Sequence, residues 1–359
     1  MRVRSAVIMA VLASAIVIAA VAVAVTSSSD HPDTPVDPDK PVYPSGITLD
    51  ERTGTLHCTR SVEWTVVPQL PVFDERKPVT YSGNEVRLDT GLYSVTVGSD
   101  TFNVIVGGTV HRDVSYEYWF KGDYYPVSIG YDIDVDELSK ITLENRRWNA
   151  TTDYMFVDTP RLVYVDDTVR SIESQLASRF AEIGGSVDDR QGYADFLAGF
   201  AQLAIDYPIK SGQDYRVWGS VEYWAISLET LYHASGDCED SAAVAASLFI
   251  AAGYDAAMVG VPGHVVAGVH IDQFVPRDME EFATYNPTYG VFVPASRPSV
   301  VEGDPQDIIY QGVETTEGQA PVGYLLNGSE KSLGKKTLYW GISGFYPVHT
   351  DDGGIQGSS

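Results

Sequence analysis

Apolar and polar positions alternate along the first half of the chain with the two-residue period of β-strands. The runs Leu92 to Val97 and Thr101 to Val106 flank the turn-forming segment Gly98-Ser99-Asp100 and therefore predict a hairpin. The aromatic run Ser115 to Phe120 predicts another strand. Together these runs predict a small antiparallel, β-sandwich-like domain over residues 46–137.

The second half changes to the helical period and then returns to strands. Apolar residues recur at helical spacing from about Leu138, and later runs are short, apolar and rich in β-branched residues. Helices followed by strands indicate an α+β domain, which we place at residues 138–346. The expected helices span 169–183, 193–205, 222–233 and 241–252, and the expected strands span 255–261, 265–271 and 308–314. Polar segments predict a Pro/Asp/Ser-rich linker at 27–45 and a disordered tail at 347–359.

The N-terminal pattern predicts a membrane segment. Residues Ala6 to Val25 form an uncharged apolar run behind two arginines, and its 20 residues are enough to cross a bilayer as a helix. The arginines place the amino terminus inside the cell. We expect a signal anchor over residues 1–26, a single-pass membrane protein, and C-terminal domains outside the cytoplasm. The alternative is a secreted protein, because Ala20-Val21-Ala22 and Ala22-Val23-Ala24 are usable cleavage sites.

Composition and charge narrow the possible partners. The chain has 359 residues, of which 44% are hydrophobic, and its net charge is −25. An acidic surface repels the phosphates of nucleic acid, so we expect no nucleic-acid partner. Oligomeric state does not follow from the composition. Neither paired Cys or His ligands nor a phosphate-binding glycine loop occurs in the sequence, so we expect no metal site and no cofactor.

One of the only two cysteines lies in a segment that could support nucleophilic catalysis. Cys238 stands in Gly236-Asp237-Cys238-Glu239-Asp240, directly before an apolar helix, where unpaired backbone N–H groups can lower a thiol pKa and hold an oxyanion. Its acidic neighbours oppose a second negative charge, so a thiolate here needs an imidazolium partner. Two other interpretations remain: a small buried cysteine that only packs, or a disulfide with Cys58.

His264 can supply that partner. It lies 26 residues after the cysteine, follows the turn Pro262-Gly263 and begins an apolar strand. A lone histidine at a turn is more often a surface or capping residue, but a helix-start cysteine followed by a strand-start histidine favours a thiol–imidazole pair. A third group should orient the imidazole. Glu314, on the next apolar strand, is one candidate, and Asn286 in Tyr285-Asn286-Pro287-Thr288 is the other.

These motifs resemble those of the transglutaminase-like, papain-related cysteine protease superfamily, in its archaeal and bacterial exported form. The matching runs are Tyr223-Trp224, Leu228-Glu229-Thr230-Leu231, Gly236 to Ser241, Gly253-Tyr254-Asp255, Val261-Pro262-Gly263-His264 and Glu314-Thr315-Thr316. The resemblance implies a helix that bears the cysteine and packs on an antiparallel sheet. It also implies Cys238 as nucleophile, His264 as base and Glu314 as the acid, and it suggests Trp224 as a wall of the substrate cleft.

Two functions from different classes fit the sequence. The first is an exported thiol acyl-transfer enzyme that acts on a protein or peptide, with water as the default acceptor, so a peptidase or amidase rather than a cross-linker. The second is a non-catalytic cell-surface module that keeps this fold to bind its target.

Overall fold

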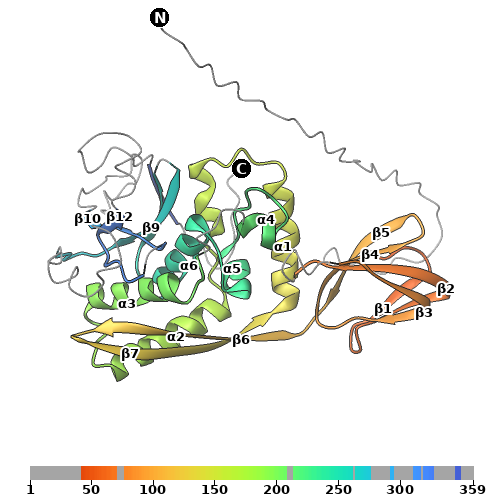
Figure 1. The fold of residues 1–359 in the computed structure, drawn as a ribbon, viewed down its shortest axis with the longest axis horizontal. Coiled ribbons are helices and arrows are strands. Elements are labelled where there is room, and N and C mark those ends of the chain that lie inside the picture. Colours follow the sequence, from red (N-terminus) through yellow and green to blue (C-terminus); the bar gives the residue numbers. More distant parts are fainter. Residues whose placement is uncertain are drawn as a thin grey trace, which may run out of the picture. The chain divides into compact units, whose positions relative to one another are not determined.

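The computed structural model describes residues 42–70, 77–207, 213–261, 263–275, 292–294, 310–316, 318–326 and 344–348. These residues form an α+β fold (Figure 1). The chain divides into two compact units, Met1–Val42 and Tyr43–Ser359, and the described elements lie in the second. The expected anchor at residues 1–26, residues 27–41 of the linker and the tail beyond residue 348 lie outside the described residues. No helix in the described part of the chain is long and apolar enough to cross a membrane.

The first five strands form one antiparallel sheet with a core of its own. Their bounds are β1 (Ile47–Asp50), β2 (Thr55–Pro68), β3 (Val79–Arg87), β4 (Gly91–Val97) and β5 (Asp100–Val106). The sheet order is β1-β2-β4-β5, with β3 also paired to the long strand β2. The hairpin predicted around Gly98 is β4–β5, in which Val97 pairs with Asp100. Buried Leu56, Trp64 and Val95 fill this core.

A long hairpin and the helices follow. The next elements are β6 (Thr109–Phe120), β7 (Asp123–Asp134), α1 (Val135–Asn149), the 3₁₀ helix η2 (Phe156–Leu162), α2 (Asp167–Glu182), α3 (Arg190–Leu203), α4 (Gln213–Val217), α5 (Ser227–His233) and α6 (Cys238–Ala251). Aspartates begin three of these helices: Asp134, Asp166 and Asp189 each accept hydrogen bonds from backbone N–H groups of the first turn. Strands β6 and β7 pair with each other and bury apolar residues in the same core as the helices.

The second sheet carries the C-terminal half of the fold. Its strands are β8 (Ala256–Val261), β9 (His264–His270), β10 (Phe292–Pro294), β11 (Tyr310–Val313), β12 (Tyr324–Leu326) and β13 (Gly344–Pro347). They lie in the order β10-β12-β11-β9-β8-β13, with antiparallel pairing everywhere except between β11 and β12. Helix α6 packs against β8 and β9 on one side and against α2, α3 and α5 on others. The helix is therefore buried along almost its whole length, as its apolar sequence requires.

One predicted helix is shorter than the sequence pattern indicated. The helix expected at 222–233 begins only at Ser227, because residues 223–226 have an extended path. Their backbone N–H groups donate to four different side chains: Asp214, Asn149, Asp240 and Glu229. These bonds replace the helical ones: three of the acceptors come from other segments, and the fourth, Glu229, caps α5 from its first turn.

Candidate active site

Cys238 is the first residue of α6, as the sequence predicted for the start of the apolar helix. The preceding loop approaches the helix closely at Gly236. A Cβ atom on Gly236 would lie 2.5 Å from Asp240 Cβ and 3.0 Å from Thr230 Cγ2, so only glycine fits there. The loop is also tied to an earlier segment, because Gly236 N and Ser235 Oγ both donate to Asp206 O. These contacts fix where the thiol emerges.

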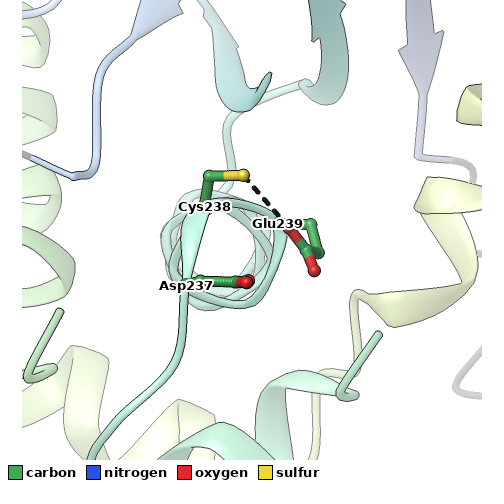
Figure 2. A group of neighbouring side chains, drawn as sticks. All are labelled: Asp237, Cys238 and Glu239. Atoms are coloured by element: carbon green, nitrogen blue, oxygen red, sulfur yellow. Dashed lines mark hydrogen bonds between the residues drawn. The ribbon is translucent and has the colours of Figure 1, made fainter. Parts of the chain in front are cut away.

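The thiol of Cys238 has an acidic environment. Its Sγ donates a hydrogen bond to Glu239 Oε2 over 3.1 Å, and Figure 2 shows the pair together with Asp237 at the start of the helix. Burial, together with the charges of Glu239 and Asp237, raises the pKa of the Cys238 thiol. A hydrogen bond from the backbone of Val265 opposes that rise. Cys238 therefore lies beside Val265, the second residue of β9, and His264 is the residue that begins this strand.

His264 and Glu314 form a direct pair. His264 Nε2 lies 3.1 Å from Glu314 Oε1 and 3.2 Å from Oε2. Glu314 is 0% exposed and also accepts bonds from Thr315 N, Thr316 N and Thr316 Oγ1. Burial alone would raise the pKa of Glu314, but the hydrogen bonds and charge supplied by His264 and Thr316 outweigh it and lower that pKa to about 2. Glu314 is thus a buried carboxylate whose surroundings favour its ionised form and which contacts the Nε2 side of the His264 ring.

The segment that carries Glu314 is held from two sides. Gln202, in α3, donates from Nε2 to Glu314 O over 2.7 Å and to Ala320 O over 2.8 Å. Ser241, in the first turn of α6, shares a hydrogen bond of 3.0 Å with Thr315. The segment after β11 that carries Glu314 is therefore hydrogen-bonded directly to α6, the helix that begins with Cys238.

Only one of the two ring nitrogens of His264, Nε2, contacts Glu314. Because Nε2 faces Glu314, Nδ1 is the nitrogen left for proton exchange. No hydrogen bond joins Cys238 to His264 among the described residues; the thiol is directed to Glu239 instead. Catalytic contacts in ligand-free enzymes are frequently long and tighten only on substrate binding.

The other residues singled out in the sequence have different positions. Trp224 is 4% exposed, packs against Trp148 and Tyr154, and donates from Nε1 to Glu222. Asn286, the alternative third member, lies outside the described residues. Cys58 is in β2, and both cysteines are free, so the alternative of a disulfide between them does not hold.

The contacts of two residues in this region were not predicted from the sequence. Tyr207 lies near the site: burial raises its pKa, and the charges of Cys238, Asp237, Glu239 and Glu314 add to the rise. Glu229, in the run Leu228-Glu229-Thr230-Leu231, is fully buried near the start of α5 and accepts from Asn145 Nδ2, Tyr223 OH and Ile226 N. Its contact with Asn145 spans 84 residues of chain, so the local sequence does not show it.

No protein-family model, curated protein or solved structure matches this chain. The interpretation of the site therefore depends on its own geometry and chemistry.

Proposed function

We propose that this protein is a thiol acyl-transfer enzyme of transglutaminase-like type, most simply a peptidase or amidase. In this proposal Cys238 is the nucleophile, His264 the general base and Glu314 the residue that orients the imidazole. The observation that carries the proposal is the pair formed by His264 Nε2 and the buried Glu314 carboxylate. The backbone of Val265, the residue after His264 in β9, bonds to the Cys238 sulfur and so brings the thiol close to this pair.

The proton path follows from the partners of the imidazole. With Nε2–H donating to Glu314, Nδ1 accepts the thiol proton of Cys238. The thiolate attacks an amide carbonyl, forming the C–S bond of a tetrahedral intermediate, and the imidazolium then gives its proton to the leaving amine. Water, deprotonated by the same Nδ1, releases the acid and regenerates the thiol. The first N–H groups of α6 lack helical partners and are suited to hold the oxyanion.

The ionised state of Glu314 supports this role. A carboxylate that stays negative accepts the hydrogen bond from His264 Nε2 and so holds the imidazole in one tautomer and one orientation. Gln202 and Ser241 hold the segment around Glu314 in place, so the acceptor geometry does not depend on a free loop.

A binding module that keeps the fold without catalysis is the second candidate. The observation in its favour is the Cys238 thiol itself, which is bonded to Glu239 and whose pKa is raised by burial and by its acidic neighbours. In that case the thiol stays protonated and unreactive towards electrophiles.

Thiol reactivity separates the two candidates. The purified full chain is treated with iodoacetamide and with a peptide vinyl sulfone at neutral pH, and the labelled residue is identified by mass spectrometry. The enzyme proposal requires labelling of Cys238 at least tenfold faster than labelling of Cys58, the partly exposed thiol in β2. The rate at Cys238 should fall at least tenfold in His264→Ala and several-fold in Glu314→Gln.

The control lies on the same strand. His270, at the far end of β9, pairs with the exposed carboxylate of Asp272, so His270→Ala removes a similar ion pair away from the thiol. Its labelling rate should equal that of the wild type. Equal labelling of Cys58 and Cys238, unchanged in His264→Ala, would contradict the enzyme proposal and favour the binding module. Incorporation of a fluorescent primary amine into a glutamine peptide would indicate transfer to amines rather than hydrolysis.

A further inference from the structure

Carboxyl groups from three segments gather at the N-terminus of α6. Oxygens of Asp214, Glu222 and Glu239 lie within 4.8 Å of one another, and so do oxygens of Asp214, Asp237 and Asp240. Asp214 belongs to both groups and joins them into one cluster. Asp214 comes from α4 and Glu222 from the loop after it, whereas the other three belong to the start of α6.

The cluster is buried, and part of it has no partner. Asp214 is 4% exposed and Glu239 is 3% exposed. Asp214 Oδ1, Asp237 Oδ1 and Glu239 Oε1 are buried without a hydrogen-bond partner. The second oxygens are occupied, since Asp214 Oδ2 accepts from Tyr223 N and Glu239 Oε2 accepts from Cys238. Each of these two buried carboxylates therefore presents one free oxygen to the cluster.

Asp237 is the N-cap residue of α6, but its side chain does not cap the helix. It precedes the first residue of α6 but accepts no capping hydrogen bond from the helix, unlike the aspartates that begin α1, α2 and α3. Its carboxyl instead faces that of Glu239, and Figure 2 shows its side chain extending toward the side of the helix on which Glu239 lies. Two carboxylate acceptors that face each other need a shared proton, a bridging water or a cation between them.

Basic side chains contribute little to balancing the charges in the cluster: His264 acts on Asp237 through its charge but is bonded to Glu314. Among the described residues, no salt bridge involves any of these five carboxyl groups. Burial raises the pKa of Asp214, Asp237, Glu239 and Asp240, and the charges of neighbouring carboxylates add to the rise at Asp214, Glu239 and Asp240. Buried carboxyl groups are neutralised by protons, paired with cationic side chains or coordinated to a metal, because leaving their charges uncompensated costs several kcal/mol each.

We propose that this cluster is a binding site for a hard divalent cation, with calcium as its first occupant. The free oxygens Asp214 Oδ1, Asp237 Oδ1 and Glu239 Oε1 would provide the protein ligands, and Glu222, on the exposed side, would complete the set. Calcium prefers several carboxylate oxygens in a flexible arrangement, whereas magnesium demands a strict octahedron and keeps its water. Zinc favours cysteine and histidine ligands. This inference does not depend on acyl transfer by Cys238.

Terbium provides a direct probe, because it takes calcium sites and is excited by nearby tryptophan. Trp224 Nε1 donates to Glu222 Oε1 over 3.0 Å, so terbium in the cluster should give strong sensitised luminescence. The purified full chain, freed of metals with a chelator, is titrated with terbium and then with calcium, magnesium or zinc, and its melting temperature is measured with each ion. We expect saturable luminescence displaced by calcium and a melting temperature that rises with calcium.

Neutral isosteres locate the site. Glu239→Gln and Asp214→Asn should each weaken calcium and terbium binding at least tenfold, while Glu182→Gln, which alters an exposed carboxylate in α2, should leave binding unchanged. Without metal, both cluster variants should melt at or above the wild-type temperature, because the substitutions remove like charges. That second measurement distinguishes lost binding from lost folding.

Three results would overturn the proposal. The first is a wild-type protein whose luminescence and melting temperature do not respond to calcium or magnesium, which would mean that protons alone neutralise the cluster. The second is binding of equal strength in Glu239→Gln and Asp214→Asn, which would place the ion elsewhere. The third is binding selective for zinc and abolished in Cys238→Ala, which would make the thiol the principal ligand.

Discussion

Glu314 is a buried carboxylate whose ionised form is favoured by hydrogen bonds from His264, Thr315 and Thr316. Its pKa is lowered from 4.5 in the unfolded chain to about 2 in the fold. A lowered pKa stabilises the fold above pH 4.5, and the contribution disappears as the pH falls towards 2. A difference of this size corresponds to about 3 kcal/mol.

We therefore expect Glu314→Gln to lower the free energy of unfolding by up to about 3 kcal/mol at pH 7, and by much less at pH 2.5. Urea denaturation of both proteins across this range measures the gap. The acidic cluster at α6 also titrates, but it is present in both proteins and so cancels in the difference. A gap that stays constant between pH 7 and pH 2.5 would show that Glu314 is not ionised in the fold.

Glu229 has a structural task at the start of α5. It accepts from Asn145 Nδ2 over 2.7 Å, from Tyr223 OH over 2.9 Å and from Ile226 N over 2.9 Å, all buried. Glu229→Ala would leave these donors without an acceptor, so we expect a loss of about 3 kcal/mol in unfolding free energy, measured by urea denaturation. Glu229→Gln keeps one acceptor oxygen and should lose less. Equal losses in the two variants would argue against a role as shared acceptor.

At the scale of elements, the sequence predicted those whose stabilising contacts are local. The apolar helix α6, the strand of His264 and the β4–β5 hairpin all begin and end within a few residues of the expected positions, because periodicity and turn residues determine them. The helix expected from residue 222 failed because acceptors from Asp214, Asn149 and Asp240 capture its first N–H groups. Such acceptors cannot be seen in the local sequence.

The site shows the same division. Cys238, His264 and Glu314 could be identified from the sequence because each lies at one end of an apolar element. The pairing of β9 with β11 then brings His264 and Glu314 together. The carboxylate cluster was not predicted, since Asp214 and Glu222 carry no metal-ligand spacing relative to Glu239 and meet it only in the fold. Similarly, Gln202 contacts the Glu314 segment across 112 residues of chain.

The junction between the cysteine loop and α6 gives a prediction at this scale. Gly236→Ala would place a methyl group 2.5 Å from Asp240 Cβ, a backbone-anchored atom that cannot move without shifting the helix. We expect a loss of about 2 kcal/mol in unfolding free energy, together with slower alkylation of Cys238. Ser235→Ala, one residue earlier, removes a hydrogen bond to Asp206 O but adds no atoms and should have the smaller effect on both measurements. The reverse order of the two variants would contradict this account.

For the whole molecule, the described residues have two apolar cores of unequal size. The smaller belongs to the sheet β1–β5, and the larger joins the β6–β7 hairpin, the helices and the second sheet around α6. The proposed nucleophile therefore starts a helix that is central to the larger core. Substitutions at Cys238 should be kept small for this reason, and alanine is the appropriate replacement.

The N-terminal run gives a prediction for the whole protein in its cell. Residues Ala6 to Val25 are apolar and long enough to span a bilayer, and the net charge of −25 gives the rest of the chain no electrostatic attraction to anionic lipid. We therefore expect the full chain to sediment with membranes and to resist extraction by alkaline carbonate, whereas a chain without residues 1–26 should be found in the soluble fraction. The intact mass of the membrane-bound protein should include the N-terminal segment. A mature protein that starts after Ala22 or Ala24, recovered outside the cells, would show instead that the segment is a cleaved signal peptide.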